Sequence, residues 1–407
     1  MAAHGCVGEL SNMKQTLWII TELFPPEETS TGYIMGQIAN AMTLKYNVKV
    51  ICGPAVYDSS KKQNKNGESN IDDSIEVFHV EAVSENKSNK LSRMRKFLLM
   101  SWKLFRVAKN KIKSGDHVLM VTNPFPLIVL MGHLHRHRKF MMTMLVHDIM
   151  PESLYTEINI PPIVYKIASK VFNKAYTCAD QLVSIGRDMT EVLQSKCRGY
   201  SHKPKISLVE NWGDVENIYP EYTFEAKNIT IQYAGNIGNA QGVGEFVELL
   251  HEANCNNVSF DIWGVGNAEN EIKEKVKEYG MLDCVMFHGS YLRSQQQMVL
   301  NHCDMALVCL VEGMYGLGVP SKAYNILAAG KPILYIGEKG TEIWRMIREN
   351  GNGVCFEPND KMGLQEYLRG LSLGSRTAFV EMGKISRRLA EEKYSKAAIL
   401  EKYTKLV

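Results

Sequence analysis

The chain has 407 residues and a formal net charge of +3, with 45% hydrophobic and 22% charged residues. This composition is ordinary for a globular protein and argues against a disordered or fibrous chain. The length predicts two or three domains. No apolar run is long enough to span a bilayer, and the first twelve residues lack the basic and apolar parts of a secretory signal.

The cysteines and histidines do not predict a metal site. The nine cysteines are scattered without a C-x-x-C pair, which favours reduced thiols. His133, His135 and His137 have metal-like spacing, but arginines and a lysine interrupt and follow them. Because cations repel a metal ion, we expect a solvated basic surface there. The chain also lacks Asp-x-Asp, so no carboxylate clamp for a metal–diphosphate complex is expected.

Short apolar runs alternate along the chain with segments whose apolar residues recur at helical spacing. Strands are predicted at 17–20, 48–51, 118–121, 141–146, 182–185, 206–209, 231–234, 259–263, 285–287, 305–310, 333–336 and 354–356. Strands that alternate with helices indicate parallel, doubly wound α/β sheets. Twelve strands are too many for one such sheet, so we predict two similar domains.

The domain boundary is predicted in the polar stretch 214–228. We assign residues 13–215 to a first Rossmann-like domain and 216–383 to a second one. Residues 384–407 are predicted to form a C-terminal helix that crosses back to the first domain, which is an expectation from the fold class. Since ligands bind at the carboxyl ends of strands in such sheets, the strand-end loops should face one cleft.

Each domain begins with a strand, a glycine-bearing loop and a helix. Gly32 follows the first strand, and Gly235 to Gly238 follow the first strand of the second domain. Gly264 and Gly266 form another strand-end pair. Glycine lets backbone approach a ligand closely, although a tight turn without a ligand is an equal alternative. Neither loop contains G-x-G-x-x-G, which weakens a dinucleotide interpretation.

The segment from Gly318 to Pro332 indicates a phosphate site. Pro320 and Ser321 are typical of a helix start, with Ser321 as N-cap, and Gly330 is typical of a helix end. The first turn of a helix presents unpaired N–H groups to an anion, and Lys322 adds a positive charge there. We therefore expect this helix start to bind a phosphate group.

His147 and Asp148 follow the predicted strand 141–146. A polar pair at the carboxyl end of a buried strand is well placed to meet a substrate hydroxyl. The alternative is a capping aspartate beside a buried histidine. We interpret both as candidate catalytic residues.

A basic segment precedes residue 114. Between Asn86 and Lys113 there are ten lysines and arginines and no acid. On a helical wheel, large apolar residues also fall on the charged side, as expected for a helix that rests on anionic lipid. The predicted membrane-facing residues are Arg95, Lys96, Leu99, Trp102, Lys103, Arg106 and Lys109. The alternatives are a core helix with a basic outer face and a nucleic-acid site, which no other basic–aromatic stripe supports.

The order of these motifs resembles that of family 4 retaining glycosyltransferases of the GT-B fold. The resemblance is to the subgroup of N-acetylfucosamine transferases of bacterial surface polysaccharides, and it covers about residues 14–400. It rests on Phe24-Pro25-Pro26, Gly32, His147-Asp148, Pro151-Glu152, Asn211-Trp212, Tyr233 to Gly238, Phe287, Gly289, Pro320 to Tyr324 and Ala328 to Pro332.

The resemblance implies a nucleotide-sugar donor in the second domain and an acceptor in the first. It implies a diphosphate site at Ser321, Lys322 and the loop of Gly235, Asn236, Ile237 and Gly238, with Gly264 at the neighbouring strand end. It further implies that Phe287, Gly289 and Tyr291 line the base, Glu342 meets the ribose, Gly32 approaches the sugar phosphates, and Asp148 faces the acceptor.

Two departures from the family pattern stand out. Many members carry an arginine and a lysine where this chain has Asn236 and Gln241. Many also carry two glutamates where this chain has Leu317 and Asn325. Lys322 is therefore expected to be the main cation on the diphosphate, and the role of the glutamate pair does not carry over.

We thus expect a cytoplasmic glycosyltransferase, peripheral on the inner face of the membrane. It would move a sugar, expected to be an N-acetylated amino sugar, from a UDP-sugar to a lipid-linked saccharide acceptor, with no metal, no other cofactor and no nucleic acid. The alternatives are a UDP-sugar epimerase of the same fold, a nicotinamide-dependent oxidoreductase, and a catalytically idle lipid- or polysaccharide-binding protein.

Overall fold

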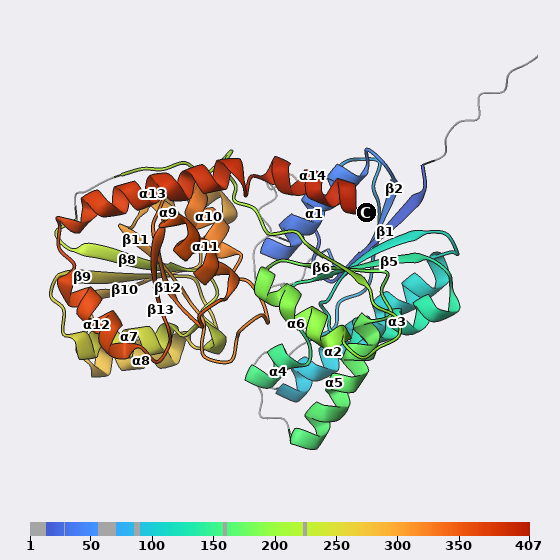
Figure 1. Ribbon diagram of the computed structural model, residues 1–407, viewed down its shortest axis with the longest axis horizontal. Coiled ribbons are helices and arrows are strands. Elements are labelled where there is room, and N and C mark those ends of the chain that lie inside the picture. Colours follow the sequence, from blue (N-terminus) through green and yellow to red (C-terminus); the bar gives the residue numbers. More distant parts are fainter. Residues whose placement is uncertain (1–13, 28, 56–70, 85–89, 158–160, 223–225) are drawn as a thin grey trace, which may run out of the picture.

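The computed structural model describes residues 14–27, 29–55, 71–84, 90–157, 161–222 and 226–407. It contains two parallel sheets, each with helices on both faces, arranged side by side along the longest axis (Figure 1). This confirms the predicted α/β fold class, the GT-B arrangement of two Rossmann-like domains.

The first sheet has the strand order β3-β2-β1-β4-β5-β6-β7. Its strands are β1 (Thr16–Thr21), β2 (Asn47–Cys52), β3 (Glu76–His79), β4 (His117–Val121), β5 (Met141–Val146), β6 (Gln181–Ser184) and β7 (Lys205–Leu208). The helices are α1 (Ser30–Met42), α2 (Lys90–Lys111), α3 (Pro126–His137), α4 (Glu152–Glu157), α5 (Pro162–Tyr176) and α6 (Arg187–Cys197). The strand order reverses between β1 and β4, which opens a crevice at their carboxyl ends.

The second sheet has the order β10-β9-β8-β11-β12-β13, with its reversal between β8 and β11. Its strands are β8 (Ile229–Ala234), β9 (Val258–Trp263), β10 (Val285–Gly289), β11 (Met305–Cys309), β12 (Ile333–Ile336) and β13 (Gly353–Phe356). The helical segments are η1 (Asn239–Gln241), α7 (Val243–Ala253), α8 (Glu269–Glu278), η2 (Arg293–Gln295), α9 (Gln296–Asn301), α10 (Lys322–Ala328), α11 (Glu342–Asn350) and α12 (Lys361–Gly370).

All twelve predicted strands are present, and the sequence analysis missed one strand, β3. The sequence Glu76-Val77-Phe78-His79 contains only two apolar residues and lies at the edge of the first sheet, where both Val77 and Phe78 are only half-buried. A strand without a continuous apolar run gives a weak signal, whereas the central strands are buried on both faces and read as apolar runs.

The C-terminal segment forms two helices instead of the single one expected from about residue 384. α13 (Ser375–Glu392) packs on α10 of the second domain, and α14 (Lys396–Leu406) packs on α1 of the first domain. Ser395 caps α14 by accepting a hydrogen bond from the Ala398 amide, which explains the break. Figure 1 shows the pair bridging the two domains.

Two expectations concern a membrane-spanning helix and a metal site. Within the described ranges, no helix is both long enough and apolar enough to cross a membrane. Among the residues that the structure describes, no group of three or more His, Cys, Asp or Glu side chains is placed to hold a metal ion. His135 instead pairs with Asp180 at 3.0 Å (Nε2 to Oδ2).

Candidate active site

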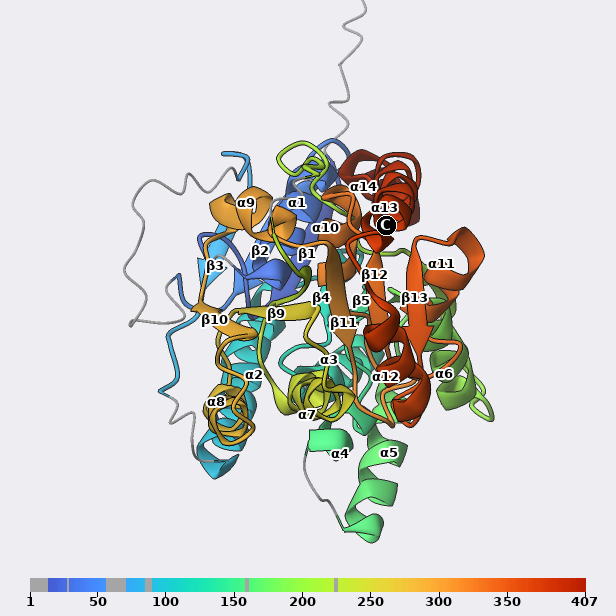
Figure 2. The ribbon, with the colours of Figure 1, turned by 90° about the vertical axis from the view of Figure 1, so that its left-hand side faces the viewer.

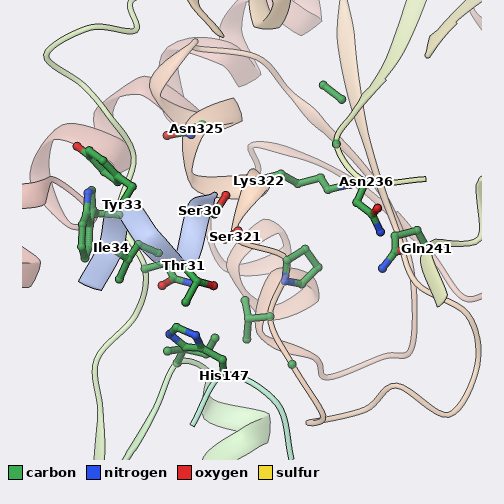
Figure 3. A pocket seen from close by; sticks show the side chains of 18 of the residues that line it. Ser30, Thr31, Tyr33, Ile34, His147, Asn236, Gln241, Ser321, Lys322 and Asn325 are labelled. Atoms are coloured by element: carbon green, nitrogen blue, oxygen red, sulfur yellow. The ribbon is translucent and has the colours of Figure 1, made fainter. Parts of the chain in front are cut away.

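A cleft of about 390 Å³ lies between the two domains, at the carboxyl ends of both sheets (Figure 3). The first domain contributes the start of α1, the end of β5 and the Asn211–Trp212 linker. The second domain contributes the loop after β8, η1 and η2, and the segment that opens α10. Both topological reversal points therefore face the same cavity, as predicted for doubly wound sheets.

Lys322 is the buried cation of the cleft. It is the first residue of α10, and its Nζ lies 3.6 Å from the centre of the Tyr233 ring. Burial lowers the pKa of Lys322 to about 7, because an ammonium group loses its hydration there. Among the described residues, no carboxylate lies within ion-pair distance of Lys322, which leaves this amine open to an anionic ligand from the cleft.

Gly235 lies directly beside the Lys322 side chain, which leaves no room for a larger residue. Its φ of +152° is strained for other residues, and a Cβ atom at this position would lie 2.9 Å from the Lys322 Nζ. A side chain here would push the lysine away from the cavity. Asn236, the next residue, also lines the cleft and points toward Gln241 in Figure 3. The glycine therefore gives a ligand access to the cation.

Ser321 lines the cleft beside Lys322, but it does not cap the helix as predicted. Its backbone is already helical, with φ −60° and ψ −24°, and its side chain makes no cap hydrogen bond. A residue in the helical region cannot turn its hydroxyl onto the amides of the first turn. The Ser321 hydroxyl therefore remains at the cavity surface.

The predicted catalytic pair is on the opposite wall, at the end of β5. The backbone amide of His147 donates to Thr122 Oγ1 at 3.2 Å, which fixes the turn after the strand. Asp148 is exposed to the cavity, and a Cβ atom on Gly318 would lie 3.3 Å from its Oδ1. Asp148 therefore faces the segment that leads to Lys322.

His147 is neutral. Burial lowers its pKa to about 4, and its buried Nε2 has no hydrogen-bond partner among the described residues. Figure 3 shows the ring next to Thr31 and Ile34. A neutral imidazole with a free nitrogen can exchange a hydrogen bond with a hydroxyl group, but its low pKa makes it a poor base.

Arg293 is a second cation of the cleft that the sequence analysis missed. Its guanidinium carbon lies 3.4 Å from the centre of the Tyr33 ring, and Nη2 lies 3.4 Å from Asp214 Oδ2. Arg293 belongs to the second domain and Tyr33 to the first, so this stack closes the cleft from both sides. Arg293 lies two residues after Tyr291, and no local sequence pattern distinguishes it from other surface arginines.

Asn325, which replaces a family glutamate, also lines the cleft. Its Oδ1 accepts a hydrogen bond from the Asp214 amide at 3.0 Å, and its Nδ2 lies 3.4 Å from Gln296 Oε1. Asn325 thus ties α10 to the interdomain linker. A neutral amide fits this place because Asp214 already carries the negative charge that Arg293 faces.

Several predicted donor residues lie near the cleft without lining it. The structure brings Gly235, Asn236, Tyr291, Ser321 and Lys322 together with His147 and Asp148 at the cavity. The described residues that it places outside the lining are Gly32, Ile237, Gly238, Gly264, Phe287, Gly289 and Glu342.

The packing explains two of these glycines and the isoleucine. A Cβ atom on Gly264 would lie 1.8 Å from the Gly235 carbonyl oxygen, so this glycine lets two loops cross. A Cβ atom on Gly32 would lie 2.7 Å from the Glu27 carbonyl oxygen. The Ile237 side chain is fully buried in the core, and its amide donates to Val265. These residues shape the loops that carry the site.

Glu342 does not reach the cavity, so the structure does not bring it to the site expected for a ribose contact. Its carboxylate is buried and accepts two hydrogen bonds from the Arg187 guanidinium, both at 3.0 Å, and one from the Arg187 amide at 2.7 Å. Since Arg187 starts α6 of the first domain, this pair joins the two domains. Glu342 is the first residue of α11, and no local sequence pattern points to its partner Arg187.

The predicted membrane-facing helix α2 is exposed along one side. Arg95, Leu99, Trp102, Arg106 and Lys109 are exposed, with 40% exposure for Leu99 and 51% for Trp102. Lys103 is half-buried and pairs with Glu81 at 3.2 Å.

The prediction for Lys96 was wrong. Its side chain is 6% exposed, and its Nζ lies 3.6 Å from the buried Glu22. A buried carboxylate at the end of β1 requires a nearby cation, and one helical position of α2 supplies it. Leu98, next to Leu99, is 54% exposed.

The chain is similar in sequence to known glycosyltransferases. Residues 214–388 match the family model described as glycosyl transferases group 1. The chain is 27% identical over 402 residues to the probable glycosyltransferase WbjE of Pseudomonas aeruginosa, covering 96% of this chain and 97% of the relative. It is 26% identical over 195 residues to the putative colanic acid biosynthesis glycosyl transferase WcaI of Escherichia coli K12, covering 47% and 46%.

Among solved structures, the fold is similar to that of Anabaena HepE in complex with UDP. The TM-score is 0.69 at 11% identity, with 97% of this chain and 99% of that chain covered. This likeness supports the fold. The family match disfavours the epimerase and oxidoreductase alternatives. Taken together, the family match and the similarity to WbjE over nearly the whole chain show that the chain is a glycosyltransferase.

Proposed function

We propose that this glycosyltransferase moves a sugar from a UDP-sugar to a lipid-linked saccharide acceptor in the synthesis of a bacterial surface polysaccharide. The resemblance to family 4 supports an N-acetylated amino sugar and retention at the anomeric carbon. The relative named for colanic acid biosynthesis supports the polysaccharide, and the neighbour in complex with UDP supports the nucleotide.

The observation that carries the donor site is the buried Lys322 beside Gly235. The two cations among the described lining residues, Lys322 and Arg293, both belong to the second domain. A sugar-nucleotide diphosphate is an anion of the size that this part of the cleft admits. Binding it would return Lys322 to its charged state, because the diphosphate replaces the lost hydration.

The reaction breaks the bond between the anomeric carbon and the β-phosphate oxygen, and it forms a bond from that carbon to an acceptor oxygen. Negative charge develops on the departing diphosphate, and Lys322 is placed to stabilise it. The acceptor proton is taken by the leaving phosphate oxygen, so no strong protein base is needed. Asp148 orients the acceptor hydroxyl, and the free Nε2 of His147 hydrogen-bonds a sugar hydroxyl.

This proposal assigns the charge stabilisation to lysine and arginine, and it requires neither a metal ion nor another cofactor.

We further propose a peripheral position on the inner face of the membrane. The exposed Leu99 and Trp102 of α2 lie among exposed basic residues, which favours contact with anionic lipid over a purely solvated helix.

The experiment is an assay of a panel of UDP-sugars with and without bacterial lipid-linked saccharides. We expect sugar to appear in the lipid fraction only when both substrates are present, with release of UDP. Interconversion of a UDP-sugar in the absence of acceptor would instead indicate the epimerase. Absence of both UDP-sugar binding and turnover over the whole panel would overturn the proposal.

A further inference from the structure

Helix α5 exposes a row of large apolar side chains that the proposed reaction does not use. Ile163 is 71% exposed, Val164 49%, Ile167 60% and Val171 43%. These positions recur at helical spacing, so they form one face of α5. Such a row is costly in water, and a contiguous apolar face of this kind marks an interaction site.

The charges on α5 itself are all positive. Lys166, Lys170 and Lys174 are exposed beside the apolar side chains, and α5 contains no aspartate or glutamate. The neighbouring helices α2 and α3 likewise contain basic residues and no acid, whereas α4 and α6 also contain acids, of which Glu152 is paired with Lys196. A partner for this face must therefore be apolar inside and anionic outside, which is the chemistry of an anionic bilayer surface.

The beginnings of α2 and α5 project from the same end of the first domain. Figure 2 shows both helices, with α4 between them, at the lower end of the molecule, and Figure 1 shows the same end from the side. Phe97 of α2 and Phe172 of α5 both pack on Phe125, with ring centres 5.2 and 6.1 Å apart. This packing holds the two helices as one rigid unit.

The unit is connected directly to the catalytic wall of the cleft. α4 begins four residues after Asp148 and contacts η1 of the second domain across the cleft. Glu152 of α4 accepts a hydrogen bond from the Tyr165 hydroxyl at 3.2 Å. The same carboxylate pairs with the buried Lys196 at 2.7 Å. A surface that holds α5 therefore also fixes the position of Asp148 relative to that surface.

We propose that α5, together with the exposed Arg93 and Arg95 of α2, is a docking surface for an anionic lipid bilayer, with the apolar row of α5 as its anchor. Ile163 and Ile167 enter the boundary between headgroups and acyl chains, and the three lysines lie at the phosphate level. The side of the first domain that carries α4 then lies close to the bilayer. The inference takes from the proposed function only its lipid-linked acceptor; binding to the bilayer is measurable without any substrate.

The test is co-sedimentation of the full chain with phosphatidylcholine vesicles that contain or lack phosphatidylglycerol. We expect binding to the anionic vesicles that weakens at high salt. The variant Ile163→Glu/Ile167→Glu should lower the partition coefficient at least about tenfold, since two buried apolar side chains become charged. The variant Lys166→Glu/Lys170→Glu should lower the partition coefficient about fivefold or more for each lysine.

A matched control uses exposed apolar residues of the second domain. Leu282→Glu/Met298→Glu changes side chains that are 65% and 55% exposed, and it should leave vesicle binding unchanged. UDP binding and circular dichroism should be unchanged in all variants, because none of these residues lines the cleft. Loss of UDP binding in the wild type would contradict the donor site and leave the membrane measurement intact.

Two results would overturn the docking surface. One is equal sedimentation of the α5 variants and the wild type with anionic vesicles. The other is a wild-type dimer in sedimentation velocity that the α5 variant converts to monomer without any change in vesicle binding, since the row would then join two copies of the chain.

Discussion

The two walls of the cleft come from sheets of the same design, yet they differ in charge. The wall from the second domain carries the buried Lys322 and the stacked Arg293, and its loop glycine leaves room beside the lysine. The wall from the first domain carries the exposed Asp148 and the neutral His147. Similar topologies thus carry two cations on one side of the cleft and a carboxylate with an imidazole on the other, which is the basis for the proposed diphosphate and acceptor sites.

The largest expected effect is on the cationic wall. Lys322→Met should lower turnover about 10²–10³-fold, since it removes a fixed charge from the departing diphosphate and keeps a similar side-chain volume. The measurement is steady-state transfer from a UDP-sugar. Lys339→Met, which removes an exposed lysine outside the cleft, should leave turnover near the wild-type value. Near-normal activity of Lys322→Met would contradict the assignment of diphosphate stabilisation to the wall from the second domain.

The opposite wall should respond differently. Asp148→Asn is expected to lower kcat about 10²-fold because the acceptor hydroxyl loses its orienting carboxylate. The KM for the UDP-sugar should change less than about twofold, since this residue does not contact the diphosphate. A parallel rise in the donor KM would show that Asp148 belongs to the donor site.

The pH dependence of donor binding tests the burial of Lys322. In the free protein the lysine loses its proton above about pH 7, whereas the bound diphosphate favours the charged form. Binding above this pH must therefore take up a proton, and the Kd for UDP should rise about tenfold per pH unit. Titration calorimetry in buffers of different ionisation enthalpy measures both quantities. A Kd that is constant between pH 7 and 9, without proton uptake, would contradict the account.

Arg293 sharpens the comparison because it touches both walls. Arg293→Met should weaken UDP binding about fivefold to tenfold, through loss of one partly exposed charge and of the stack on Tyr33. Arg293→Lys keeps the charge and loses the planar stack, so its Kd should lie between those of the wild type and the methionine variant. An unchanged Kd in both variants would place the diphosphate away from η2.

The smallest effect on the site is expected for Glu342→Gln. Loss of the buried carboxylate should lower the free energy of unfolding by about 1–2 kcal/mol, less than for a fully buried pair because Arg187 is 30% exposed. The KM for the UDP-sugar should change less than about twofold. Thermal unfolding and donor titration separate these effects. A large rise in KM with unchanged stability would restore Glu342 as a ribose contact.

The sequence predicted the fold well because buried parallel strands produce apolar runs. Only β3 at a sheet edge lacked this signal. Local patterns also located Lys322, Gly235 and Asp148, since each lies next to a strand end or helix start. Arg293, Tyr33 and the partner of Glu342 could not be predicted, because these contacts join residues more than 150 positions apart across the domain interface. The burial of Lys96 depends on Glu22 in the same way, and a helical wheel does not contain that partner.

The most direct test of the central claim is a crystal structure of the protein with UDP. The account predicts a β-phosphate oxygen within about 3 Å of the Lys322 Nζ, with the diphosphate lying over Gly235 and the base toward Tyr291. A diphosphate bound at the wall of His147 and Asp148, with Lys322 left unpaired, would contradict it.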